Sequence, residues 1–280
     1  MIANVKNILV GLTEEGDKDE ASSALGYGLA LARDAGAHAT IQAASVKLVL
    51  TQSFVSDFAS GLVASENQRL DELAAAAAER ARQEASSFGV ACIAEAPQLS
   101  YPDLIRSFTA QARVHDLTIL DAEPVALAVD RGLIEQVLFE SGRPLIVVPA
   151  GTDTFRCRRA LVAWDGSAKA ARALNDALPF LRATEAVEIV CVTGEKDLSG
   201  SAPGSEVAPH LARHGIAVTV ADIETRNGDV AETLRNHATL LGADLIVMGA
   251  YARSRLRQMV LGGVTHSLLK SCPTPLFLSH

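Results

Sequence analysis

The residues between Val247 and Thr265 have the types and the spacing that could bind a phosphate group. An apolar, β-branched run ends at Gly249, a basic loop follows, and the pair Gly262-Gly263 opens a helical stretch. Glycine lets the backbone approach an anion closely, and the free N–H groups and positive dipole of a helix N-terminus attract one. The stretch matches neither a P-loop nor a G-x-G-x-x-G motif. It predicts a phosphate cradle, and the alternative is an ordinary strand-to-helix loop whose glycines only turn the chain.

The basic loop stands out against an acidic chain. It contains Arg253, Arg255 and Arg257, whereas the net charge of the whole protein is -8. Arginine gives phosphate charge-assisted hydrogen bonds, and a solvated arginine surface is the other interpretation. The negative net charge argues against non-specific binding to nucleic acid or to anionic lipid. We therefore expect neither a nucleic acid nor a membrane as a partner.

Composition indicates a globular protein with two domains. The chain has 280 residues, of which 49% are hydrophobic and 21% are charged, and such a length favours two domains of ordinary size. Its cysteines form no C-x-x-C pair, so we expect buried free thiols and no metal site at Cys92, Cys157, Cys191 and Cys272. The N-terminus lacks the layout of a signal peptide, and no apolar segment is long enough for a membrane span. These features predict a cytoplasmic protein.

The elements that must position the glycines occur twice along the chain. Each copy opens with a short apolar strand, continues with helices alternating with apolar strands, and closes with two further strand-like runs. The matching pairs are Asn7–Leu12 with Arg159–Trp164, Asp116–Asp121 with Asp244–Gly249, and Ser141–Val148 with Cys272–Leu278. Alternation of this kind predicts a parallel sheet with helices on both faces and right-handed crossovers. We therefore predict an α/β fold of two tandem, open, five-stranded parallel sheets, with domains at residues 1–150 and 158–280.

The two copies differ most in one segment of the first copy. Residues 47–63 are rich in apolar and small side chains and precede a predicted helix at 66–88. This segment could form an apolar lid. A packed connection is the favoured interpretation, because large exposed apolar patches are unusual in monomers.

Taken together, these motifs resemble the universal stress protein family in its tandem, two-domain form. The resemblance covers essentially the whole chain and rests on residues 161–167, 228–229, 244–249 and 272–276. The ATP-binding members carry a glycine, two residues, a second glycine, nine residues, and a third glycine followed by Ser or Thr. Gly249 and Gly262 fit this signature. Ala252 replaces the second glycine, and Gly263 stands where the hydroxyl residue is usual.

The resemblance implies a Rossmann-like fold similar to that of the adenine nucleotide alpha hydrolases. It also implies that the second half binds ATP, or AMP or ADP, and that Mg²⁺ can bind with the nucleotide. Asp165 is then expected to face the adenosine, the backbone at Val192 to meet the adenine edge, and Gly249 to border the ribose. Arg253 would add charge, and the phosphates would lie on the N–H groups of Gly262, Gly263, Val264 and Thr265. The family also implies an internal pseudo-dimer through the final strands, and two such chains can pair again as a homodimer.

Two of these motifs have a plainer interpretation, and the first half lacks the site. Residues 165–167 could form only a turn and a helix cap, and the pair Gly228-Asp229 is better explained in that way. In the first half, Thr13 replaces Asp165 and Asp121 replaces Gly249. A carboxylate there would repel phosphate, so we expect no ATP in the first half.

Three functions are consistent with the sequence. The first, which we favour, is a ligand-responsive binding module of the stress response. The second is an enzyme, at most a slow ATPase or a nucleotidyl-transfer enzyme. We identify no catalytic residue, because the glycine loop has no P-loop lysine and no paired carboxylates for Mg²⁺. The third is a nucleotide-independent scaffold or chaperone-like protein. Ala252 and Gly263 distinguish the first from the third, and Mg²⁺-dependent turnover would identify the second.

Overall fold

The computed structural model describes residues 2–13, 22–49, 57–122, 129–193, 204–225, 228–250 and 263–280. The first half contains β1 (Asn7–Thr13), α1 (Ser23–Ala35), β2 (His38–Val46), α2 (Asp57–Phe88), β3 (Cys92–Glu95), β4 (Gln98–Leu99), α3 (Tyr101–Ala112), β5 (Leu117–Asp121), α4 (Val129–Glu140) and β6 (Leu145–Val148). The second half contains β7 (Arg159–Ala163), α5 (Ala168–Asp176), α6 (Leu178–Leu181), β8 (Ala186–Thr193), α7 (Gly204–Arg213), β9 (Val218–Glu224), α8 (Val230–Leu241), β10 (Leu245–Gly249), α9 (Val264–Ser271) and β11 (Leu276–Ser279).

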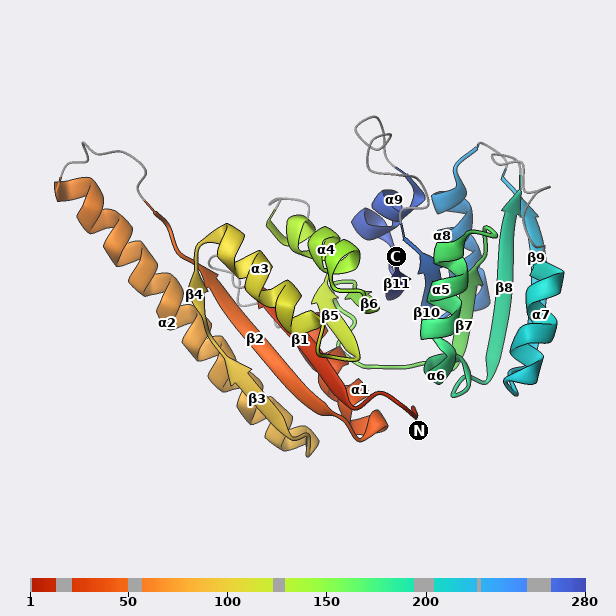
Figure 1. Cartoon of the computed structure of the whole chain (residues 1–280), viewed down its shortest axis with the longest axis horizontal. Coiled ribbons are helices and arrows are strands. Elements are labelled where there is room, and N and C mark those ends of the chain that lie inside the picture. The colour runs from red at the N-terminus through yellow and green to blue at the C-terminus, as the bar shows by residue number, and fades with distance from the viewer. Residues whose placement is uncertain are drawn as a thin grey trace.

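All of these strands belong to one sheet, in which each half contributes five strands to the main path. The order is β3-β2-β1-β5-β6 in the first half, continuing as β11-β10-β7-β8-β9 in the second, and β4 pairs with β2 off this path. Neighbouring strands are parallel except at the junction, where β6 and β11 are antiparallel and Ile146 lies opposite Phe277. Figure 1 shows the two halves side by side at this junction. The predicted fold class is confirmed, with the two sheets joined through their final strands as the pseudo-dimer requires.

Helices cover both faces of the sheet, and two cores fill the space between. One core joins the sheet to α1, α2, α5, α6 and α7. The other joins the opposite face to α3, α4, α8 and α9. The inner strands β5, β6, β10 and β11 are buried on both faces, which explains why they are almost continuously apolar rather than alternating.

The repeat extends to individual hydrogen bonds. Asp116 Oδ2 accepts from the N–H groups of Lys6 and Asn7, at 2.8 and 3.0 Å. Asp244 Oδ2 accepts from Arg158 and Arg159, also at 2.8 and 3.0 Å. In both halves the carboxylate before the fourth strand therefore fixes the start of the first strand.

The connection between the halves packs against both. Phe155 lies edge-on to Tyr27 of α1 and to Phe180 of α6, with ring centroids 5.3 and 6.4 Å apart. Phe180 in turn packs on Phe277 of β11, and the Gly151 N–H donates to Ser23 Oγ at 2.9 Å. Because the sheet runs through this junction, the domain boundaries at 150 and 158 stay a prediction.

Three expectations need correction. The helix predicted at 66–88 begins nine residues earlier, at Asp57. In the described parts of residues 47–63, the large apolar side chains of Leu48, Val49, Phe58 and Leu62 are exposed rather than packed. Of the four free thiols, Cys191 and Cys272 are buried as predicted, whereas Cys92 and Cys157 are only partly buried.

Candidate functional site

Two predicted site residues of the second half, Asp165 and Gly249, lie at the carboxyl ends of β7 and β10. These strands are neighbours, with Ala163 opposite Met248, so the chain after Ala163 and the chain from Gly249 onwards leave the sheet together. The strand order reverses between β7 and β10. Ligands of open parallel sheets bind outside such a reversal, at the carboxyl ends of the strands. The topology therefore places Asp165 and Gly249 at the position where this class of fold binds its ligands.

Asp165 shapes the turn that starts α5. Its Oδ1 accepts from the Ser167 N–H at 3.0 Å, and Gly166 has a φ of 70°, which a side chain would strain. Ser167 Oγ then caps the helix by accepting from the Ala170 N–H at 3.1 Å. The turn-and-cap interpretation of residues 165–167 is confirmed, and a ligand role for Asp165 would have to be additional to it.

The pair Gly228-Asp229 has the same plain explanation. Asp229 Oδ1 accepts from the Glu232 N–H at 2.9 Å and caps α8, while Gly228 turns the chain with a φ of 73°. The role that the structure shows for these two residues is to turn the chain and cap α8.

Gly249 allows α5 to approach the end of β10. A Cβ added to Gly249 would lie 2.4 Å from the Ala170 nitrogen and 2.5 Å from the Lys169 carbonyl carbon. Both are backbone atoms of the first turn of α5, so the space cannot be made by rotating a side chain. Gly249 is thus required for packing, whatever it does for a ligand.

Lys169 is a cation at this edge that the sequence did not single out. Burial lowers the pKa of its ammonium group, and its Nζ contacts the Nε2 atom of His280. His280 also packs edge-on against Phe139 of the first half, with centroids 4.6 Å apart. The signal was not visible in the sequence, because Lys169 and His280 are 111 positions apart.

The N-terminus of α9 points its backbone donors at the same edge. Its N-cap is Gly263, which is exposed, has φ -67° and ψ 166°, and makes no side-chain cap hydrogen bond. By contrast, α1, α5 and α8 are capped by Ser22, Ser167 and Asp229. The first N–H groups of a helix have no partner within the helix, and a helix N-terminus attracts anions.

Val192 provides backbone groups beyond the end of β7. The ladder between β7 and β8 ends at Ala163 and Val190, and the Trp164 N–H still donates to the Val190 carbonyl at 2.9 Å. In a parallel ladder alternate residues face the same neighbour. The N–H and C=O of Val192 therefore point past the end of β7. On the opposite side of β8, toward β9, the Thr193 carbonyl accepts a hydrogen bond from the Thr225 N–H.

In the first half, the corresponding position is filled by a carboxylate of the chain itself. Asp121 Oδ2 accepts from Ser22 Oγ at 2.6 Å, and its Oδ1 accepts from the Ala24 N–H at 2.8 Å. Burial raises the pKa of this carboxyl, although hydrogen bonds from Ser22, Ala24 and Ser23 oppose the shift. Asp121 thus satisfies the N-terminus of α1 with an internal anion.

Two predicted site residues, Arg253 and Gly262, lie outside the described residues, as does Ala252. Thr265 is buried in the first turn of α9. Within the described ranges, no cluster of three or more His, Cys, Asp or Glu side chains could hold a metal ion. None of the helices in the described part of the chain has the length and apolar character of a membrane span.

Comparison with known proteins finds related sequences and related folds. Residues 157–280 match the model of the universal stress protein family. The universal stress protein YxiE of Bacillus subtilis (strain 168) is 28% identical over 138 residues, covering 40% of this chain and 93% of that protein. A universal stress protein structure from Archaeoglobus fulgidus DSM 4304 matches 97% of this chain and 95% of its own with a TM-score of 0.69 and 16% identity. One from Pseudomonas aeruginosa UCBPP-PA14, titled as putative, matches 99% and 93% with a TM-score of 0.55 and 15% identity.

The fold and the site edge thus define a doubly wound α/β protein built from two copies of one unit, and the two structural matches share that fold along almost their whole length. The second half of the chain, residues 157–280, matches the universal stress protein family.

Proposed function

We propose that the second half of this chain binds an adenine nucleotide, with ATP as the first candidate, at the carboxyl ends of β7 and β10. The observation that carries the proposal is the N-terminus of α9, whose N-cap residue, Gly263, has no side chain that would compete with an anion. Phosphate is suited to these donors by charge and by geometry. Arg253 and Gly262, which precede α9 in the sequence, are proposed to extend the cradle.

The adenine would lie toward β8. The N–H and C=O of Val192 extend beyond the ladder with β7 and form a donor-acceptor pair for a base edge. Asp165 and Gly249, on the two neighbouring strand ends, would then flank the ribose. AMP or ADP would use the same contacts with fewer phosphates, and Mg²⁺ would arrive on the phosphates as part of the ligand.

The first half is proposed to bind no nucleotide. Asp121 already supplies a negative charge to the N-terminus of α1, and a phosphate there would meet a partly buried carboxylate. One nucleotide per chain follows. The chain would act as a ligand-responsive module, because a bound ligand shifts a conformational balance by its differential affinity for the two states.

A matched pair of variants at Gly263 tests this proposal without disturbing the fold. A Cβ added there meets no atom within 4 Å, and both Ser and Asp are good N-cap residues, so each variant should stabilise α9 by a few tenths of a kcal/mol, about 0.3. Gly263→Ser should retain or strengthen ATP binding because its hydroxyl can donate to phosphate. Gly263→Asp should weaken it at least about tenfold, because its carboxylate competes for the same donors. Equal ATP affinity in both variants, measured by calorimetry, would show that α9 does not hold the phosphates.

A further inference from the structure

Lys169 occupies a position at which a helix disfavours positive charge. It is the second residue of α5, and the first turn of that helix contains no acidic side chain. The N-terminus of a helix carries a partial positive charge, so a cation there lowers the stability of the helix. Burial adds to this cost, because it lowers the pKa of the Lys169 ammonium group. Conflicts of this kind with the local rules of stability are expected at functional sites.

The side chain of Lys169 crosses the end of β10 and meets a second basic group. A Cβ added at Gly249 would lie 2.9 Å from Lys169 Cβ, so the side chain starts against the last residue of β10. Its Nζ contacts Nε2 of His280, which follows Ser279 of β11, the partner of Gly249 in the ladder. The two nitrogens can share one proton, whereas two protonated groups at this contact would repel each other. Lys169 and His280 thus form a basic pair at two neighbouring strand ends.

The contacts around the basic pair hold α5 in place without it. Arg172 Nη2 donates to the Gly142 carbonyl of the first half at 2.7 Å. Ser279 Oγ donates to Asp176 Oδ2 at 3.0 Å. Neither contact brings two bases together, as the basic pair does. Attachment of α5 to its neighbours therefore does not explain why a cation stands at its N-terminus.

The first half carries the opposite charge at the same place in the repeat. Both α1 and α5 begin with a serine N-cap whose side chain accepts from the N–H group three residues further on. Aligning the two caps makes Ala24 the counterpart of Lys169, and the strand ends make Asp121 the counterpart of Gly249. The Asp121 carboxylate accepts from the Ala24 N–H at 2.8 Å. In the first half the chain therefore supplies an anion itself.

The second half differs at both of these positions. Gly249 has no carboxylate to offer, and Lys169 places a cation where the first half has an alanine. One half thus combines an anion with a neutral residue, and the other combines a glycine with a cation. The N-terminus of α9 adds further positive potential at the same edge. The charge balance of the repeat therefore predicts that the second half takes its anion from outside the chain.

Given the nucleotide site proposed above, we infer that Lys169 and His280 bind the terminal phosphates, and that they make the second half select a nucleoside triphosphate over the corresponding monophosphate. With the ribose between Asp165 and Gly249, the phosphate chain leaves from the end of β10, and the basic pair spans that end and the next. Lysine and protonated histidine both give phosphate charge-assisted hydrogen bonds. A monophosphate is two phosphates shorter and leaves the basic pair in its mutual contact.

Calorimetric titration of the full chain with ATP and with AMP, in the presence of Mg²⁺, tests the inference. The parent should bind ATP more tightly than AMP. Lys169→Met should weaken ATP binding about ten- to hundredfold, because it removes a hydrogen bond between charged groups. The same variant should change AMP binding by less than about twofold. Lys169→Arg retains the charge and should keep most of the preference for ATP.

Lys270→Met is the matched control. Lys270 is exposed and lies in the last turn of α9, at the opposite end from its N-terminus. This substitution makes the same change in net charge, and it should leave the affinity for ATP as in the parent. Equal losses of ATP binding in Lys169→Met and Lys270→Met would mean that net charge alone sets the affinity, which would overturn the inference.

Thermal unfolding separates a ligand role from a structural role. Lys169→Met removes a partly buried cation from a helix N-terminus, so we expect it to melt at or above the temperature of the parent. The variant should therefore keep its stability and lose its preference for the triphosphate. A lower melting temperature with an unchanged ratio of ATP to AMP affinity would assign Lys169 a structural role and refute a ligand role.

The titrations also distinguish the basic pair from the nucleotide site as a whole. If the parent binds ATP and AMP equally, or if Lys169→Met weakens both alike, the basic pair does not read the terminal phosphates and the nucleotide site stands. If the parent binds neither nucleotide, the site itself is refuted, and the role of the basic pair with it.

Discussion

Replacing Gly249 with alanine tests whether the packing of α5 sets the geometry of the site. The new Cβ would lie 2.4 Å from the Ala170 nitrogen and 2.5 Å from the Lys169 carbonyl carbon. Carbon contacts are optimal near 3.5–4.0 Å, so the first turn of α5 must move by about 1 Å. Overpacking of this kind costs about 1–3 kcal/mol, which corresponds to a fall of about 3–10 °C in melting temperature.

The same displacement should weaken nucleotide binding. The turn at residues 165–167 leads directly into α5, so a shift of the helix moves Asp165 relative to the end of β10. We expect the ATP affinity of Gly249→Ala to fall by at least about tenfold, because misplacement by 1 Å is costly in a preorganised site. The assays are thermal unfolding and calorimetric titration with ATP.

Gly263→Ser is the control at the same edge, because its side chain would enter open space. It should melt at or slightly above the temperature of the parent. If Gly249→Ala melts within a degree or so of the parent, the close approach of α5 to β10 is wrong. If it is destabilised but binds ATP normally, the geometry of α5 does not matter for binding.

Two further predictions concern carboxylates that lie outside the proposed ligand contacts. Asp116→Ala and Asp244→Ala should each lower the unfolding free energy by about 1–3 kcal/mol, because each removes two hydrogen bonds to a charged acceptor. The two losses should be similar, since the two carboxylates occupy the same place in the repeat. Urea denaturation measures both losses, and a large difference between them would refute the equivalence of the two carboxylates. Burial raises the pKa of the Asp121 carboxyl in the folded protein above its ordinary value of 3.8. At a pH between these two pKa values, the folded protein keeps a proton on Asp121 that the unfolded chain has released. The stability of the parent should therefore fall relative to Asp121→Asn as pH rises through this window, with the full cost present above it. A difference in unfolding free energy that is constant with pH would contradict the raised pKa.

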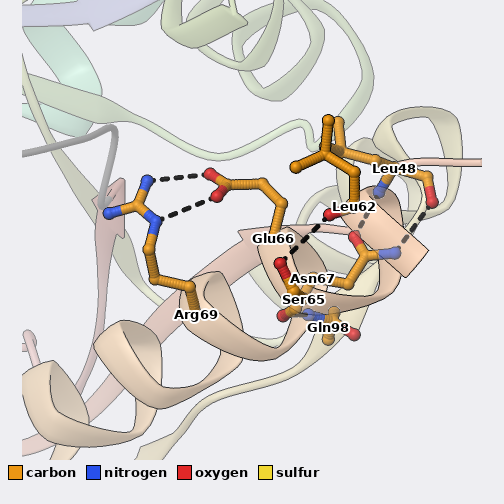
Figure 2. A network of polar contacts seen from close by, with 7 residues as sticks. All are labelled: Leu48, Leu62, Ser65, Glu66, Asn67, Arg69 and Gln98. Atoms are coloured by element: carbon orange, nitrogen blue, oxygen red, sulfur yellow. Dashed lines mark hydrogen bonds and ion pairs between the residues drawn. The ribbon is translucent and has the colours of Figure 1, made fainter. Parts of the chain in front are cut away.

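The fold could be predicted from sequence because burial on both faces makes the strands almost continuously apolar. The runs ending at Asp121 and Gly249 were recognised as equivalent strands, and β5 and β10 end at these residues. The start of α2 was missed, because residues 57–65 combine apolar and small side chains that no local pattern assigns to a projecting helix. Asn67 pairs with Leu48 in this region (Figure 2), which is a tertiary contact that local sequence does not reveal.

The features of the candidate site that follow from the direction of the parallel strands could be predicted from the sequence. The features that follow from side-chain packing could not. The sequence placed Asp165 and Gly249 at neighbouring strand ends, since parallel strands finish at one edge. It indicated that Asp121 would repel phosphate, but not that its carboxylate caps α1. It also gave no sign of Lys169, whose position beside Gly249 follows from the close approach of α5.

The most direct test of the central proposal is the stoichiometry of ATP binding by the full chain. Protein stripped of ligand by unfolding and refolding should be titrated with ATP in the presence of Mg²⁺ by calorimetry. The account predicts saturable, micromolar binding at one nucleotide per chain, about 8 kcal/mol of binding free energy. Two nucleotides per chain would contradict the assignment of Asp121 as an internal anion, and no binding would contradict the nucleotide site itself.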